Sequence, residues 1–281
     1  MMKKSFDLPV YLVAAALVLG APVVSAEDSS SPEQTDHLAR KHVVGSAEES
    51  PHEFSANVAL STDYRFRGIS QTTEDPALSG GFDYSYTPFG FYAGVWASNL
   101  DFAEPTVDTG SGAVNDTADL EIDFYGGFAG EFPMGVGWDI GGLYYAYPGS
   151  DTGTYANDYD YFEVYGSLSY DFGNFDVTGG LAYSPDYFAE SGDALYVYGD
   201  VGIPLPVADL SLSGHVGHQS IDENGTFGTP DYLDWSVGLS KDISIFTFDI
   251  SYVDTDLSDT DCFGGTDFCD ATAIFTISAS Y

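Results

Sequence analysis

The sequence predicts an all-β protein, a transmembrane antiparallel up-and-down β-barrel, on three observations. From Phe54 to Tyr281, apolar and small polar residues alternate with period two, and no helical period is sustained. The predicted strands have about 10 to 14 residues, more than the usual five or six of soluble sheets. Their ends are rich in aromatic residues, of which the chain has 21 Tyr and 20 Phe. Aromatic girdles, an apolar outer face and a polar lumen together favour a membrane barrel over a soluble sandwich.

Residues 1–53 are expected to lie outside the barrel. Residues 1–26 carry lysines, then an apolar run, then small residues up to Ala26, which is the pattern of a secretory signal peptide. The apolar run is short and rich in Ala and Pro for a spanning helix, and a retained anchor is the alternative. Residues 27–53 are rich in Ser, Glu and Pro without hydrophobic periodicity, which predicts a flexible periplasmic segment.

The alternation divides the barrel region, residues 54–281, into about twelve strands. They are expected at 54–69, 77–87, 91–102, 119–131, 136–147, 159–172, 175–186, 194–204, 209–220, 231–241, 245–256 and 271–281. The connections alternate between tight turns and mostly longer, acidic loops. In such barrels the short turns are periplasmic and the long loops extracellular, so both termini are predicted in the periplasm.

The register of each strand follows from the same alternation. Outward apolar positions include Phe54, Val58, Leu60, Leu120, Phe124, Phe128, Leu181, Leu195, Val197, Val216 and Val237. In the first strand this register turns Tyr64 and Phe66 toward lipid and Arg65 and Arg67 toward the lumen. The inward charged set is Asp63, Asp83, Glu121, Asp123, Asp139, Glu163, Asp176, Asp200, Asp234 and Asp249, with Arg65, Arg67 and His215.

The charge balance excludes one class of partner. The chain has 44 acidic and 7 basic residues, a formal net charge of −37. Such a surface does not bind nucleic acid or an anionic lipid surface by charge. It attracts cations instead.

The last predicted strand, "DATAIFTISASY", places Ala273, Phe275, Ile277 and Tyr281 on one face and ends on the aromatic residue. A terminal strand of this form resembles the signal by which the barrel-assembly machinery recognises outer-membrane barrels. The alternative is a last strand that ends in Tyr by chance.

Several blocks of the chain carry a family resemblance. The segments "SANVALSTDYRFRGISQT", "YAGVWASNLDF", "EIDFYGG", "YFEVYGSLSYDFG" and "SYVDTDLSDTDCFGGTDFCDATAIFTIS" resemble the TorF-like porin family, also called the Gcw_chp family of bacterial hypothetical proteins. The resemblance spans nearly all of residues 54–281, and its first and last blocks are the most specific. It implies a bacterial outer-membrane channel and brings no established substrate or catalytic residues.

The predicted function is therefore a porin-like channel for passive diffusion of small polar or charged solutes or ions. Twelve strands should leave a narrow passage, since eight are filled by side chains and 16 to 18 leave a wide channel. The predicted pore-lining residues are Arg65, Arg67, Asp63, Asp83, Glu121, Asp123 and Asp200. The two arginines either face carboxylates across the lumen and orient a solute there, or brace the wall by pairing with acids such as Asp63 and Asp83.

Two other functions stay open. One is a plugged structural or adhesive outer-membrane barrel with acidic surface loops. The other is a lipid-active barrel enzyme, which needs a nucleophile and a base, for example Ser213 or Ser236 with His215 or His218. No motif marks either serine, so an enzyme is not predicted.

The only two cysteines, Cys262 and Cys269, lie close together in the last predicted loop. In an exported protein such a pair predicts a disulfide. The acidic residues around them, within 254–270, could supply oxygen ligands to calcium. No ordered calcium-loop pattern is present, so a solvated acidic loop is favoured, and no cofactor is predicted.

Overall fold

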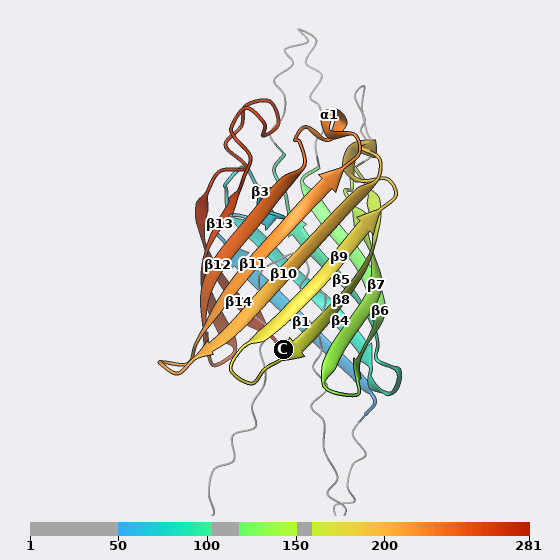
Figure 1. The fold of residues 1–281 in the computed structure, drawn as a ribbon, viewed down its shortest axis with the longest axis vertical. Helices are drawn as coiled ribbons and strands as arrows, with labels where there is room; N and C mark the ends of the chain where they lie inside the picture. The colour runs from blue at the N-terminus through green and yellow to red at the C-terminus, as the bar shows by residue number, and fades with distance from the viewer. Residues whose placement is uncertain (1–49, 103–117, 151–158) are drawn as a thin grey trace, which may run out of the picture.

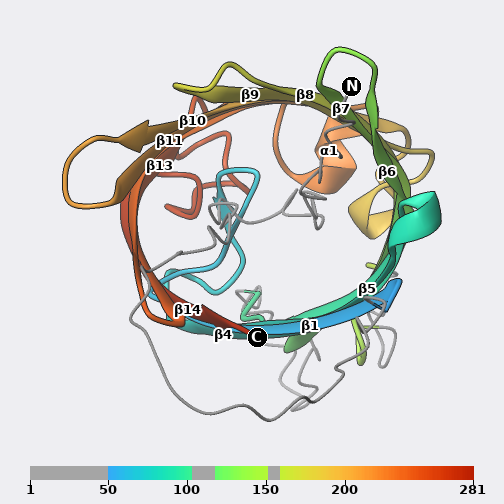
Figure 2. The ribbon, with the colours of Figure 1, turned by 90° about the horizontal axis from the view of Figure 1, so that it is seen from below.

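A computed structural model describes residues 50–102, 118–150 and 159–281 of the chain. Over these ranges it is a closed antiparallel barrel of twelve strands, in which β1 (His52–Ser61) pairs with both β4 (Ala77–Tyr86) and β14 (Thr272–Ser280) (Figure 1, Figure 2). The predicted signal peptide and nearly all of the predicted periplasmic segment lie outside the described residues. No helix in the described part of the chain is long and apolar enough to cross a membrane.

The other barrel strands are β5 (Phe91–Asn99), β6 (Leu120–Phe132), β7 (Val136–Ala146), β8 (Tyr161–Asp171), β9 (Asp176–Ser184), β10 (Ala194–Leu205), β11 (Leu210–Ile221), β12 (Tyr232–Ile243) and β13 (Phe246–Thr255). The predicted number of strands is confirmed, and every strand but the first agrees closely with its predicted bounds. The remaining elements are short: β2 (Arg65–Phe66), β3 (Ile69–Ser70), η1 (Thr87–Phe89), η2 (Phe188–Glu190) and α1 (Asn224–Phe227).

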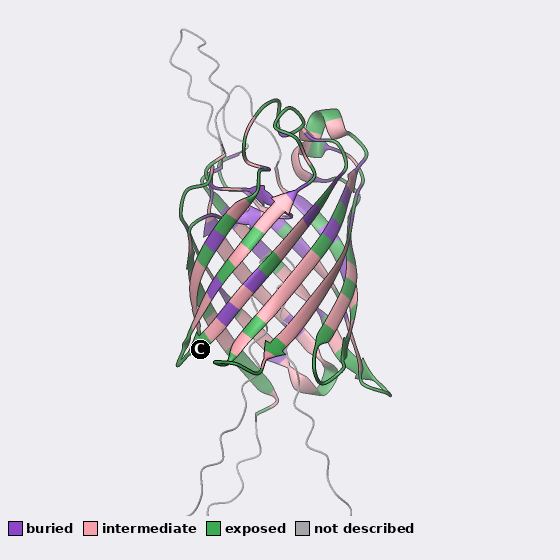
Figure 3. Cartoon of the chain, turned by 60° about the vertical axis from the view of Figure 1, so that its left-hand side comes forward, coloured by how far each residue is buried: buried purple, intermediate pink, exposed green. Residues whose placement is uncertain are grey.

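The outer face of the barrel is apolar. Phe54 is 77 % exposed, Phe82 69 % and Ile140 59 %, and each lies at an outward position of its strand. Other large apolar residues share this face, among them Val58, Leu60, Phe124, Phe128, Leu181, Val197, Val216 and Val237. Exposed and less exposed residues alternate along the strands (Figure 3). A soluble barrel buries such residues, so this pattern is that of a barrel whose outer surface faces lipid.

The two ends of the barrel differ. Short turns join β4 to β5, β6 to β7, β8 to β9, β10 to β11 and β12 to β13, and the end of β14 lies at that same end. We call it the short-turn end. The described parts of the other connections, which include α1 and η2, lie at the opposite end, which we call the long-loop end.

The chain between β1 and β4, residues 62–76, folds into the barrel (Figure 2, light blue). We call this segment the inner hairpin. In it β2 pairs with β3, Arg65 opposite Ser70 and Phe66 opposite Ile69. Arg67 (φ 46°) and Gly68 (φ 82°) form its tip, both in the left-handed region that two-residue hairpin turns require. The predicted first strand at 54–69 was therefore too long, because β1 ends at Ser61.

The inner hairpin also reverses the predicted orientation of two aromatic residues. Tyr64 and Phe66 were expected to face lipid, and this is wrong. Tyr64 is only 2 % exposed, and its hydroxyl donates to Glu121 on β6 at 2.7 Å. The ring of Phe66 lies edge-on to that of Tyr145 on β7, with 5.7 Å between centroids. Both aromatic side chains pack inside the barrel because the chain has left the wall before it reaches them.

Candidate functional site: the barrel lumen

Arg65 holds the inner hairpin together and ties it to the last loop, residues 256–271. Its Nε lies 2.6 Å from Asp63 Oδ2, and its Nη2 lies 3.0 Å from Glu74 Oε1, both within the hairpin. Its Nη1 donates to the carbonyl oxygens of Phe268 at 2.7 Å and Asp270 at 3.0 Å. The guanidinium of Arg65 therefore holds two protein segments together, which is the bracing role that one of the two sequence-based interpretations predicted.

Asp63 is the centre of that brace. Besides Arg65, its carboxylate accepts hydrogen bonds from the hydroxyls of Ser70 at 2.7 Å and Thr72 at 3.0 Å. The side chain is buried inside the hairpin. Asp63 was predicted to line the pore, and the structure places it within the inner hairpin instead.

The last loop that receives Arg65 contains the disulfide Cys262–Cys269, which is buried. The carbonyl oxygen of Cys269 accepts a bond from Thr255 Oγ1 at 2.9 Å, and that of Phe268 accepts one from the backbone N–H of Ser70 at 2.9 Å. The disulfide therefore lies beside the carbonyl groups that hold the hairpin. The acidic side chains of this loop are all within the described residues, and they form no group that could hold a metal ion.

Arg67 connects the tip of the inner hairpin to distant strands. Its Nη2 lies 2.8 and 2.7 Å from the two carboxylate oxygens of Glu163 on β8, and its Nη1 donates to Gln219 Oε1 on β11 at 2.7 Å. The guanidinium also lies over the ring of Tyr196 on β10, 4.3 Å from its centroid. Since the hairpin starts and ends at β1 and β4, these bonds cross the lumen.

Arg67 keeps its charge in this buried position. Burial by itself lowers the pKa of a guanidinium, but the carboxylate of Glu163 opposes this and the pKa of Arg67 is raised well above its usual value. The ion pair with Glu163 therefore persists while the hairpin is docked.

The other predicted pore-lining acids fall into two groups. Glu121 and Asp123, on β6, are buried beside the inner hairpin at the long-loop end. Asp83 on β4 and Asp200 on β10 lie near the middle of their strands and are partly exposed. Neither arginine pairs with Asp83, contrary to one predicted partner. The structure thus separates residues that the sequence placed in a single constriction.

Tyrosine hydroxyls donate hydrogen bonds to five of the ten inward carboxylates. Tyr64 donates to Glu121 at 2.7 Å, Tyr92 to Asp139 at 2.7 Å, Tyr145 to Glu163 at 3.1 Å, Tyr196 to Asp234 at 3.0 Å, and Tyr125 donates to Asp83. Sequence reasoning missed these pairs, although Tyr125 and Tyr196 stood at inward positions of the predicted register. A tyrosine hydroxyl is a neutral donor, so it adds no positive charge beside the carboxylate.

His215 on β11 is the third basic residue of the predicted inward set. Its Nδ1 lies 2.6 Å from Asp200 Oδ1, and its Nε2 lies 2.7 Å from the hydroxyl of Tyr196 and 3.1 Å from Asp234 Oδ1. Ser236 stands opposite His215 in the register of β11 and β12. Both ring nitrogens already have partners, so the histidine is not oriented toward that serine as a general base would be.

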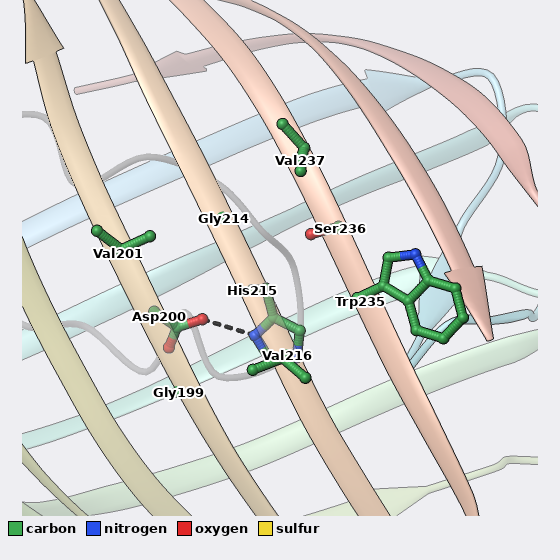
Figure 4. Close-up of a pocket in the computed structure, with 9 residues that line it drawn as sticks. All are labelled: Gly199, Asp200, Val201, Gly214, His215, Val216, Trp235, Ser236 and Val237. Carbon is green, nitrogen blue, oxygen red and sulfur yellow. Dashed lines mark hydrogen bonds and ion pairs between the residues drawn. The ribbon is translucent and has the colours of Figure 1, made fainter. Parts of the chain in front are cut away.

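A pocket on β10, β11 and β12 is lined by residues from both sides of the wall (Figure 4). Asp200 and His215 belong to the inward side and are joined by the hydrogen bond drawn there. Val216 and Val237, each 53 % exposed, stand at outward positions, and Trp235 is on the same side of β12. The valine and tryptophan side chains of this pocket belong to the apolar outer face of the barrel.

Comparisons with known proteins identify a family. The family described as "Bacterial protein of unknown function (Gcw_chp)" matches residues 46–281. No curated protein sequence matches the chain.

Several solved structures are similar to this chain at low identity. The NanC porin is 10 % identical over 82 % of this chain and 99 % of its own, with a TM-score of 0.48. LpxR from Salmonella typhimurium is 9 % identical over 81 % and 99 %, with a TM-score of 0.45. The outer membrane protein opdK from Pseudomonas aeruginosa is 13 % identical over 74 % and 58 %, with a TM-score of 0.41.

Proposed function

The chain belongs to the Gcw_chp family of bacterial proteins, and for this member we propose an outer-membrane channel that passes small polar or charged solutes and favours cations. In this proposal the short-turn end is periplasmic and the long-loop end extracellular. A signal peptide ending at Ala26 exports the chain, and the last strand, ending in Tyr281, engages the barrel-assembly machinery.

The observation that carries the proposal is the inverted polarity of the closed barrel. Its exposed outer positions are Phe, Leu, Val and Ile, whereas its inward positions carry carboxylates, hydroxyls and glycines. Only a lipid surround makes such an exterior stable, and the polar interior suits water and hydrophilic solutes.

The preference for cations follows from where the arginines point. Arg65 and Arg67 are both used to dock the inner hairpin, with their guanidinium groups bound to Asp63, Glu74 and Glu163. Farther along the lumen, Asp83, Asp139 and Asp249 have no cationic partner among the described residues. In a narrow space with low-dielectric walls, these fixed charges raise the local concentration of cations.

The inner hairpin makes the long-loop end the narrow part of the channel. It packs into a cluster of buried aromatic residues that includes Tyr64, Tyr145, Tyr147, Tyr161 and Tyr187. This same packing favours a second candidate function, a plugged structural barrel that conducts nothing. The two candidates differ in whether the hairpin leaves a path for ions or blocks it.

Recording from planar bilayers separates the two candidates. Purified, refolded protein should give discrete conductance steps, and a KCl gradient should give a reversal potential of the sign for cation preference. Asp83→Asn combined with Asp200→Asn should move that potential toward zero, with Asp171→Asn, an exposed residue at a short turn, as the matched control. Absence of conductance from wild type, together with conductance from a variant lacking residues 63–75, would support the plugged barrel.

A further inference from the structure

Two inward tyrosines lie flat against the barrel wall because a glycine on the neighbouring strand makes room. A Cβ atom at Gly94 on β5 would lie 2.4 Å from the hydroxyl of Tyr125, on β6. A Cβ atom at Gly180 on β9 would lie 2.4 Å from the hydroxyl of Tyr198, on β10. No side chain fits at either position while the tyrosine stays in place. One face of each ring is therefore covered by backbone, and both residues remain partly exposed.

Each of these rings has a carboxylate beside it. The hydroxyl of Tyr125 donates to Asp83 on β4. Tyr198 stands two residues before Asp200 on the same inward face of β10, and its ring is inclined by 26° to that of His215, with 6.1 Å between centroids. The side chain of Asp200 is bonded to His215 but is still 41 % exposed. Part of its carboxylate is therefore open to the lumen.

The two pairs belong to opposite walls. In the order of strands around the barrel, β7, β8 and β9 separate β6 from β10 on one side, and β12, β13, β14 and β1 separate β11 from β4 on the other. Figure 2 shows β5 and the pair β10–β11 on opposite sides of the ring. A solute that passes through the lumen meets a tyrosine and a carboxylate on each side.

We infer that this mid-lumen site, formed by Asp83, Tyr125, Tyr198 and Asp200, binds organic cations such as amines, guanidines or quaternary ammonium ions. The face of an aromatic ring attracts a cation, and the attraction is strongest for weakly hydrated organic cations. The carboxylates supply the opposite charge at the rim of each ring. A neutral solute such as a sugar gains nothing from the negative field, and K⁺ gains little from the ring faces because its hydration is tight.

The inference rests on the proposed channel. Two measurements distinguish failure of the binding site from failure of the channel: K⁺ current and binding by calorimetry. Tetramethylammonium is the probe, and glucose at the same concentration is the neutral control. Tetramethylammonium should reduce the K⁺ current through wild type, and calorimetry on the folded protein in detergent should show its binding. Glucose should do neither.

Variants assign the effect to the rings. Tyr198→Leu and Tyr125→Leu remove a ring face and should weaken block and binding by about tenfold. Tyr198→Phe and Tyr125→Phe keep the ring and should stay within about twofold of wild type. If a leucine variant fails to fold, Asp200→Asn tests the same site by charge and should weaken binding as well.

Each outcome has one meaning. K⁺ current without block or binding by tetramethylammonium overturns the inference and leaves the channel intact, as does block that the leucine variants do not change. Binding without any K⁺ current supports the site and contradicts the channel. Equal responses to glucose and tetramethylammonium would show a site for neutral solutes and overturn the inference.

Discussion

Nη2 of Arg67 lies 2.8 and 2.7 Å from the two carboxylate oxygens of Glu163, and this ion pair joins the tip of the inner hairpin to the far wall of the barrel. Both side chains are almost fully buried. Separating a buried ion pair leaves each charge buried without its partner, which costs free energy. The two residues therefore fix the position of the hairpin more firmly than an exposed pair could.

Replacing Arg67 should release the hairpin. In Arg67→Met, Glu163 stays buried without its counter-charge, which costs about 3 to 5 kcal/mol in comparable cases. Release of the hairpin toward the long-loop end relieves that cost, so single-channel conductance should rise several-fold. Lys241→Met is the matched control, because Lys241 is a cation whose Nζ donates to the carbonyl of Ala208 near a short turn, away from the inner hairpin. Unchanged conductance in Arg67→Met would mean that the ion pair does not hold the hairpin.

Removing both members of the pair should restore docking in part. The double variant Arg67→Met with Glu163→Met leaves no buried charge unpaired, so the cost that drives release disappears. We expect the double variant to conduct less than Arg67→Met alone. The coupling is measured by a double-mutant cycle on conductance and on thermal unfolding, and additive effects of the two changes would contradict a direct interaction.

The disulfide should matter for the same hairpin through Arg65. Its loop presents the carbonyl oxygens of Phe268 and Asp270 to the guanidinium. Reduction, or replacement of Cys262 and Cys269 by serine, should lower the free energy of unfolding by about 2 to 4 kcal/mol. Conductance should become noisier as the hairpin loosens. Reductant added to the serine variant is the control, and any effect there would point to a cause other than the disulfide.

Alkaline pH should loosen the docked hairpin through Tyr64. Burial, and then the charge of Glu121, raises the pKa of the Tyr64 phenol well above its usual value. Because the docked state holds this proton more tightly, docking is fully stable below the ordinary tyrosine pKa of about 10 and weakens as the pH rises above it. Conductance at constant ionic strength should rise above about pH 10. Tyr64→Phe, which has no phenolic proton, should show a smaller rise.

The sequence predicted the strands of the barrel wall better than the inner hairpin inside the lumen. Period-two alternation is a local property, and outward residues such as Phe124 and Val197 need only lipid as a neighbour, so their positions followed directly. "DYRFRGIS" also alternates, but that alternation belongs to the inner hairpin. The sequence signal for this hairpin was the pair Arg67–Gly68, which forms its two-residue turn. The structure explains the glycine, because a Cβ atom at Gly68 would lie 2.5 Å from Thr255 Cγ2.

The partners of the charged residues were beyond sequence reasoning for a physical reason. Arg67 and Glu163 are far apart in the chain, and their contact depends on the hairpin crossing the lumen rather than on strand register. The same holds for Tyr64 with Glu121, whereas Tyr125 with Asp83 was within reach of a register argument. The sequence signal for such a pair is an inward tyrosine on a strand near one that carries an inward acid.

Conductance with and without the inner hairpin tests the account most directly. Wild type and a variant lacking residues 63–75 are recorded in the same KCl gradient, after matched folding is shown by heat-modifiable migration. The deletion should raise conductance several-fold while the reversal potential keeps the sign of cation preference. Equal conductance in the two proteins, or loss of cation preference on deletion, would contradict it.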